Sequence, residues 1–373
     1  LFPVTRRWIY LNHAAVGPLP RYVLKAVRGY VRAISTLGDK HWDKTWDLLE
    51  ELRARLAAWI GAEADEVAFT RNASEGISVL ALGLDWRPGD NVVLPAVEFP
   101  ANVYPWLNLS HKGVEARFVP LRDGGFGLED VRARVDGFTR VLAVSSVQFY
   151  NGFQADLAAL GRFCRERGIL FCVDAIQQLG ALPLDVRAAR ADFVACGCHK
   201  WWMAGEGFGF LYCRREVLDL VRPALVGWLG VAHWQNFLDY QLEFPPSARR
   251  YETGNLSAFG AHALRASLAF QEKMGAEALA EPVRALARRA RRSAVDRGLT
   301  VATPENGAPS GIVSFRVPGR DSALLVAALA RDGVQVAARN GFIRVSPHFY
   351  NTAEEIDEFF LRLDRAAAAA PAL

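Results

Sequence analysis

Polar residues follow several apolar runs of this chain at the point where each run ends. The segments are Arg71–Ser74, Glu98–Phe99, Gln148, Asp174 with Gln177, and His199–Lys200. The carboxyl ends of parallel strands meet at one edge of a sheet, and ligands bind there. None of these side chains is needed for packing, so we expect them to converge on one ligand site.

Lys200 has the residue type and the surroundings of a nucleophilic amine. It lies beside Trp201 and Trp202, and loss of water around a lysine lowers its pKa. Such an amine can form a Schiff base with a carbonyl group, although a lysine that only passes along tryptophans would show the same pattern. Asp174 stands 26 residues earlier, after the apolar run Ile169–Val173. Alone it is either a helix cap or a ligand partner.

The segment Arg71–Gly76 joins a strand to a helix through small residues. Its backbone N–H groups and the Ser74 hydroxyl suit a phosphate, and an ordinary Ser or Asn helix cap is the alternative. A phosphate cradle, a carboxylate and a lysine, in this order, match the needs of pyridoxal phosphate. The helix start would bind its phosphate, the carboxylate would keep its ring nitrogen protonated, and the lysine would bind its aldehyde.

The chain resembles the class V aminotransferase and cysteine desulfurase group of fold-type-I pyridoxal phosphate enzymes. The resemblance extends from Tyr10–Ala15 to Arg344–Thr352, and its most specific part is Val173–Gln177 followed by His199–Trp201. It implies pyridoxal 5'-phosphate as cofactor, an amino acid as substrate, and a homodimer with the active site at the subunit interface.

The resemblance also implies roles for individual residues. Lys200 would hold the cofactor as a Schiff base and later move the α-proton, and Asp174 would pair with the pyridinium nitrogen. Arg344 would bind the α-carboxylate of the substrate, a bidentate task that suits a guanidinium. Further matching positions are Ala73, Ser74 and His199 at the phosphate, Gln177 at the ring oxygen, Phe99 on the ring face, and His13 and Gln148 near the substrate. For His13 and Gln148, roles in the core or in loops fit equally well.

Three positions depart from the pattern of the family. Phe99 stands where many relatives have His, so the site has one acid–base group fewer. Asn255 stands where relatives often have a Thr that reaches the phosphate of the neighbouring subunit. Gly197, three residues before the lysine, replaces a frequent Ser or Asp.

The cysteines bear on the type of reaction. Cysteine desulfurases carry a catalytic cysteine on a loop shortly before the substrate arginine, whereas Val336–Arg344 is short and has none, since all five cysteines lie between residues 164 and 213. The pattern resembles the isopenicillin-N-epimerase-like branch, which predicts a class V aminotransferase or an epimerase-like enzyme. The alternatives are a lyase that eliminates sulfur from the β-carbon, a cysteine desulfurase-like enzyme, or, less favoured, a non-catalytic cofactor-binding protein.

A mostly parallel α/β sheet must position these residues. Short apolar strands alternate with amphipathic helices from Val67 to Cys213, and helical patterns dominate after about residue 258. We predict an N-terminal segment 1–20 near the active site and a large cofactor-binding domain 21–257 with a seven-stranded sheet. A smaller α+β domain 258–373 would carry Arg344.

The composition excludes several classes of protein. The chain has 373 residues, 51% of them hydrophobic and 23% charged, as in ordinary globular proteins. A net charge of +4 suggests no nucleic-acid partner, and no histidine shows metal-ligand spacing. The longest apolar run, Ala323–Ala330, is shorter than the roughly 20 residues that span a membrane. Sparse cysteines favour a reducing compartment, so we expect a cytoplasmic protein, although the chain begins at Leu1 and residues before it are not known.

Overall fold

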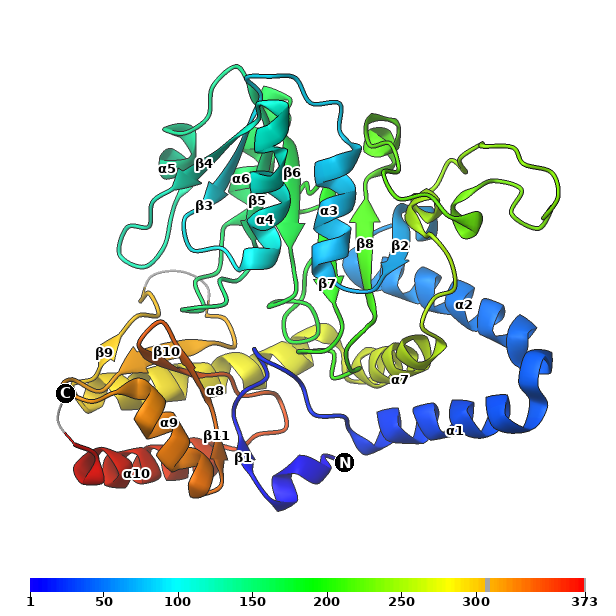
Figure 1. Ribbon diagram of the computed structural model, residues 1–373. Coiled ribbons are helices and arrows are strands. Elements are labelled where there is room, and N and C mark those ends of the chain that lie inside the picture. Colours follow the sequence, from blue (N-terminus) through cyan, green and yellow to red (C-terminus); the bar gives the residue numbers. More distant parts are fainter. Residues whose placement is uncertain (306–308, 372–373) are drawn as a thin grey trace.

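The centre of the molecule is a seven-stranded sheet with the strand order β2-β8-β7-β6-β5-β3-β4 (Figure 1). The structure, a computed structural model, describes residues 1–305 and 309–371. The strands are β2 (Val67–Thr70), β3 (Asn91–Pro95), β4 (Glu115–Val119), β5 (Thr139–Ser145), β6 (Leu170–Asp174), β7 (Phe193–Gly197) and β8 (Gly209–Cys213). β8 runs antiparallel to β7 and β2, and the remaining pairs are parallel. This confirms the predicted α/β class and the mostly parallel sheet.

Both faces of this sheet are buried, which explains why its strands are nearly continuous apolar runs. Phe171 and Val173 of β6 face one core, and Cys172 between them faces another. Helix α6 (Leu157–Arg167) covers the first face and α3 (Ala73–Gly83) covers the second (Figure 1). The shorter helices α4 (Tyr104–Leu107) and α5 (Leu128–Arg132) complete the crossovers.

The ends of α6 follow the local sequence. The Asp156 side chain accepts a hydrogen bond from the Ala159 backbone N–H at 3.0 Å and caps the first turn. Gly168 ends the helix in the left-handed region, with φ of 67°, where glycine has no steric penalty.

Three long helices pack on one another next to the sheet edge that β2 forms: α1 (Arg21–Leu37), α2 (Trp42–Ile60), which contacts β2, and α7 (Ala258–Met274). α7 packs against α1 and α2, and its Leu264 and Leu268 belong to the core of the large domain. The separate hydrophobic core of the C-terminal part is therefore formed mainly by α8 and the elements that follow it. The predicted boundary at residue 258 remains a prediction.

The C-terminal part is built on a four-stranded antiparallel sheet with the order β12-β13-β10-β9. Its strands are β9 (Thr300–Val301), β10 (Val313–Arg316), β12 (Ala337–Arg339) and β13 (Phe342–Val345). The helices α8 (Ala276–Asp296), α9 (Ser322–Arg331) and α10 (Ala353–Ala369) supply its core. Figure 1 shows the carboxyl ends of β6 and β7 pointing towards this smaller part.

The N-terminal segment is tied to the smaller domain. Its strand β1 (Ile9–Tyr10) pairs in parallel with β11 (Val334–Gln335), and Asn12 forms a bridge with Ser346. Within residues 1–305 and 309–371, no helix has the length and apolarity needed to cross a membrane.

Candidate active site

Lys200 follows β7 and is almost fully buried, with 7% of its surface exposed. Burial lowers the pKa of its amine to about 8, an effect that the Asp174 carboxylate opposes and that Arg344 and Arg339 reinforce. Its Nζ lies 5.3 Å from the centroid of the Phe99 ring. About a tenth of the amine is therefore uncharged at pH 7, far more than for an ordinary lysine, and this form can act as a nucleophile or a base.

Asp174 is the last residue of β6 and pairs in register with Ala195 of β7. Its Oδ1 accepts a hydrogen bond from the Ile176 backbone N–H at 3.0 Å. Burial raises the pKa of the carboxyl group, while the nearby Lys200 amine lowers it. The fold thus brings together the carboxylate and the amine predicted from the sequence.

The start of α3 faces an open cleft of about 870 Å³, lined by Ser74, Ser78, Phe99 and Tyr104 among others. Asn72 caps this helix, because its side chain accepts a hydrogen bond from Glu75 N–H at 2.9 Å. Ser74 is therefore not the cap, and the N–H groups of Ala73 and Ser74 at the start of the helix have no partner within it. The structure keeps Ala73 and Ser74 in a position suited to an anion.

Gly197 and His199 explain each other. A Cβ atom at residue 197 would lie 3.3 Å from His199 Nδ1 and 3.1 Å from Ile176 Cδ1, tighter than ordinary contact. The imidazole therefore occupies the space that a Ser or Asp side chain would need. Burial, followed by repulsion from Lys200, lowers the pKa of His199. It is neutral at pH 7 and offers one N–H donor.

Gln177 links the lysine segment to the N-terminus. Its amide oxygen accepts a hydrogen bond from Trp201 Nε1 at 2.9 Å, and its nitrogen donates to the Ala14 carbonyl at 3.0 Å. One N–H of the amide is left for a ring oxygen. Gly17 N–H donates to the His199 carbonyl at 2.7 Å, and a Cβ at Gly17 would overlap the Lys200 carbonyl oxygen. The segment 1–20 thus packs directly behind the lysine.

Arg344 lies on β13 with 2% of its surface exposed. Its Nη1 donates to the Phe149 carbonyl at 2.7 Å, and its Nε is buried without a partner. Burial, with repulsion from Arg339, lowers the pKa of the guanidinium to about 9. A desolvated cation with an unused donor is a site for an anionic acceptor.

A buried carboxylate, Glu98, is a site residue to which the sequence reasoning assigned no role. It accepts hydrogen bonds from Ser145 N–H at 2.7 Å, Gln148 Nε2 at 2.6 Å, Asn102 Nδ2 at 3.1 Å and the Ser145 hydroxyl. Burial raises the pKa of Glu98 to about 7 against these four bonds. Because the Gln148 nitrogen is bound to Glu98, its buried oxygen, which has no partner, is turned away as an acceptor. The available signal was a Glu three residues after the end of the buried strand β3.

Two of the predicted site residues, His13 and Asn255, offer no unpaired polar atom to the space around Lys200. His13 is fully buried, donates from Nδ1 to the Ser346 carbonyl at 2.9 Å and accepts the Tyr350 hydroxyl at Nε2, at 2.8 Å. Both ring nitrogens of His13 already form hydrogen bonds, and a contact between His13 and the substrate remains a prediction. Asn255 is exposed in a groove of about 370 Å³ that is lined by α1, α2 and α7. Its phosphate contact requires a second subunit and also remains a prediction.

The five cysteines are all free and buried. Burial raises the pKa of each thiol. Because the thiolate is the nucleophilic form of cysteine, these side chains are poor nucleophiles. None of them belongs to the β12–β13 hairpin that precedes Arg344.

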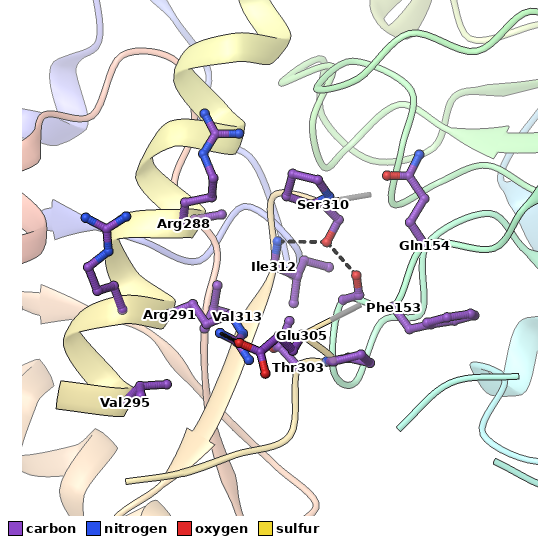
Figure 2. Close-up of a pocket in the computed structure, with 15 residues that line it drawn as sticks. Phe153, Gln154, Arg288, Arg291, Val295, Thr303, Glu305, Ser310, Ile312 and Val313 are labelled. Atoms are coloured by element: carbon purple, nitrogen blue, oxygen red, sulfur yellow. Dashed lines mark hydrogen bonds and ion pairs between the residues drawn. The ribbon is translucent and has the colours of Figure 1, made fainter. Parts of the chain in front are cut away.

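A second cavity, of about 380 Å³, lies between α8 and the loop after β5 (Figure 2). Arg288, Arg291, Gln154 and Ser310 are among its lining residues, and Ser310 Oγ donates to the Gly152 carbonyl at 2.7 Å. None of the predicted site residues lines this cavity, so it is separate from the site around Lys200.

The chain is similar in sequence to a known family of proteins over nearly its full length. The family model described as "Aminotransferase class-V" matches residues 9–359. A probable cysteine desulfurase of Pyrococcus abyssi is 30% identical over 383 residues, covering 96% of this chain and 94% of the relative. An uncharacterized aminotransferase of Bacillus subtilis, YcbU, is 28% identical over 356 residues, covering 95% of this chain and 94% of the relative.

Among solved structures, the apo cysteine desulfurase from Thermococcus onnurineus superposes with a TM-score of 0.89 at 26% identity. The match covers 98% of this chain and 96% of that structure. The fold of this chain is therefore shared with that enzyme over nearly the full length.

Proposed function

The chain belongs to the aminotransferase class-V family, and on that premise we propose that Lys200 is the catalytic base of a pyridoxal phosphate-dependent enzyme that acts at the α-carbon of an amino acid. The observation that carries this proposal is the buried amine of Lys200, whose pKa is lowered to about 8 and which feels the charges of both Asp174 and Arg344. When bound, pyridoxal phosphate supplies an electron sink for the electron pair left on the α-carbon.

The residues present fit this cofactor. The buried Asp174 carboxylate suits a protonated ring nitrogen, and the unfilled first turn of α3 suits a phosphate. Gln177 retains one N–H for a ring oxygen, and the Phe99 ring is positioned beside Lys200 Nζ. We therefore assign cofactor binding to these residues together with Ala73, Ser74 and His199.

The side chains of the chain then divide the work. Arg344 binds the substrate carboxylate, and this fixes the α-hydrogen relative to Lys200. The Lys200 Nζ accepts the α-proton from its almost fully buried position. Phe99 covers the ring face but transfers no proton, so the proton chemistry falls to Lys200.

For the subsequent step we propose cleavage of a C–S bond. The names of the Pyrococcus and Thermococcus proteins favour this alternative over the predicted transamination or epimerisation. Similarity to the isopenicillin-N-epimerase-like branch remains a prediction. The burial of all five thiols favours elimination over sulfur transfer to a cysteine of the enzyme.

This elimination needs no reagent other than water. The α-proton passes to Lys200, the Cβ–S bond breaks with its electron pair on sulfur, and the sulfur then takes up a proton. Water releases the remaining three-carbon unit as pyruvate and ammonia. Cysteine would thus yield pyruvate, ammonia and sulfide.

Product analysis tests this reaction type. With cysteine or an S-substituted cysteine, we expect the cofactor-loaded enzyme to form pyruvate and thiol or sulfide in equal amounts, with no alanine. Cys196→Ala and Cys198→Ala should leave the rate within about twofold, since neither thiol enters the reaction. Formation of alanine, lost in a cysteine variant, would instead establish a desulfurase. An oxo acid formed only in the presence of an amino acceptor would establish the second candidate, transamination, which the family name favours.

The lowered pKa of Lys200 predicts a pH dependence of cofactor uptake. Only the uncharged amine attacks an aldehyde, so the uptake rate should rise about tenfold per pH unit below 8 and level off above it. Asp174→Asn removes the charge that raises the Lys200 pKa and should move the midpoint to lower pH. Stopped-flow absorbance of cofactor-free protein measures both. A midpoint near the ordinary lysine value of 10.5 would contradict the assigned environment.

We further propose a homodimer with the active site at the subunit interface, in the cytoplasm. Exposed apolar side chains in residues 225–242 support a subunit contact, namely Leu225, Val226, Phe237, Leu238, Tyr240 and Leu242. Five free cysteines support a reducing compartment. A monomer in sedimentation velocity at micromolar concentration would contradict the dimer.

A further inference from the structure

The four-stranded sheet turns one face towards the large domain, and this face carries three arginines. Arg344 stands opposite Ser314 and Ala337, while Arg339 stands opposite Phe342. Opposed residues of antiparallel strands point to the same face, as do alternate residues of one strand. Arg316, two residues after Ser314, is therefore on this face too. The other face, with Val313, Phe315, Ile343 and Val345, forms the core of the small domain.

Contacts with the large domain show where this face lies. The Ser314 hydroxyl donates to the Tyr150 carbonyl at 2.6 Å, and Arg344 Nη1 donates to the Phe149 carbonyl. The Tyr150 ring meets the Phe342 ring edge to face, with centroids 5.9 Å apart. The arginine-bearing face thus adjoins the loop after β5, which also carries Gln148.

These three cations lack acidic partners. Across residues 1–305 and 309–371, no carboxylate lies within 4.0 Å of Arg316, Arg339 or Arg344. Arg339 is exposed, and its Nη1 donates to the neighbouring Ala338 carbonyl at 2.8 Å. The Arg316 guanidinium carbon lies 5.6 Å from the centroid of the Phe342 ring. Arg339 also lowers the pKa of both Lys200 and Arg344, so its charge acts within the candidate site.

The spacing of the arginines suggests a ligand with two anionic ends. Arg339 and Arg316 lie in a row across the sheet that is two residues from the row of Arg344, which corresponds to about 7 Å along a strand. A molecule with carboxylates separated by roughly three methylene groups spans a similar length. Phe342, between Arg339 and Arg316 in that row, offers apolar surface to the methylene groups.

We propose that Arg339, assisted by Arg316, binds a second carboxylate of the substrate, at the end of the side chain. This rests on the proposed function in one respect, that Arg344 binds the α-carboxylate. The substrate class is then an amino acid with a carboxylate-bearing side chain. For a C–S lyase, it is a cysteine whose sulfur substituent ends in a carboxylate.

Two carboxylic acids of equal chain length test this subsite without any turnover. Glutarate has carboxylates at both ends, whereas valerate has one. By calorimetry with the cofactor-loaded protein, we expect glutarate to bind on the order of fivefold or more tightly than valerate. Arg339→Gln should remove this preference and weaken the binding of valerate much less than that of glutarate. The matched control is Arg331→Gln, an exposed arginine at the end of α9, which should keep the preference.

The outcomes separate this proposal from the proposed function. Equal affinities of the unaltered protein for glutarate and valerate, or a preference retained in Arg339→Gln, would overturn the second carboxylate site. Because neither acid has an amino group or sulfur, both results are independent of whether the enzyme cleaves a C–S bond. If Arg344→Gln left the binding of both acids unchanged, the assignment of the α-carboxylate site itself would fail.

Discussion

Replacing Lys200 with alanine is expected to lower the rate of α-proton removal by about 10³-fold or more, since this variant loses both the base and the attachment point of the cofactor. The buried amine is the proton acceptor next to the α-carbon in our proposal, and the neighbouring Phe99 cannot replace it. The measurement is deuterium incorporation at the α-carbon of cysteine and other amino acids in heavy water, followed by NMR. This readout does not depend on the bond that breaks next.

The control for this variant is Lys273→Ala, since Lys273 is exposed on α7. It should exchange the α-proton at the rate of the unaltered enzyme. Lys200→Ala removes a partly desolvated charge and should therefore fold with an unchanged melting temperature or a higher one. If the folded Lys200→Ala protein exchanged the α-proton at an undiminished rate, another base would be at work.

Arg344→Ala is expected to weaken substrate binding by on the order of 2–5 kcal/mol, the range for loss of one partner from a buried charge pair. In the absence of substrate, the guanidinium Nε is buried without a hydrogen-bond partner. A carboxylate bound there satisfies this donor, and an alanine cannot. We expect KM to rise by the corresponding factor and kcat to fall less. Arg344→Lys should recover only part of the affinity, because an ammonium group cannot form the two-point contact of a guanidinium.

Steady-state kinetics separate KM from kcat in these variants, with Arg331→Ala as the control in the same domain. That exposed arginine at the end of α9 should leave KM unchanged. An unchanged KM in Arg344→Ala would show that the substrate carboxylate binds elsewhere. A loss of kcat alone would give Arg344 a role after binding.

The positions of site residues could be predicted from the sequence where these residues lie at the ends of strands. Asp174 and Lys200 follow apolar strands that can lie only inside a parallel sheet, and such strands end at the same edge. Arg344 could be assigned through the resemblance, since nothing in its local pattern distinguishes a carboxylate-binding arginine from one on a solvated strand. Its burial and its unused Nε depend on packing against Phe149, nearly two hundred residues away in sequence.

The remaining site features depend on contacts that a linear pattern does not contain. Glu98 accepts hydrogen bonds from Ser145 at the end of β5 and from Gln148 in the loop after it. Only the pairing of β3 with β5 brings these residues together. His13 looks like a free imidazole in the sequence, but the fold surrounds it with Ser346 and Tyr350. Gly197 departs from the family pattern, and only the fold shows the reason, because the His199 ring fills the space that a side chain at residue 197 would need.

The helices before the first predicted strand show the same limit. No element was predicted between residues 21 and 60, yet α1 and α2 fill this range almost completely. The apolar residues of α1 recur at helical spacing although only Val23 is fully buried, so the helix itself could have been predicted, whereas its packing partner could not. Its position depends on packing against α7, more than two hundred residues later.

The attachment point of the cofactor tests the central claim most directly. Pyridoxal phosphate is added to the protein, the covalent bond is reduced with borohydride, and the digested protein is mapped by mass spectrometry. We predict one pyridoxyl group per chain, on the peptide that contains Lys200, and none on the peptides with Lys112 or Lys273. A label on another lysine, or no specific label at saturating cofactor, would contradict the assignment of Lys200 and with it the proposed site.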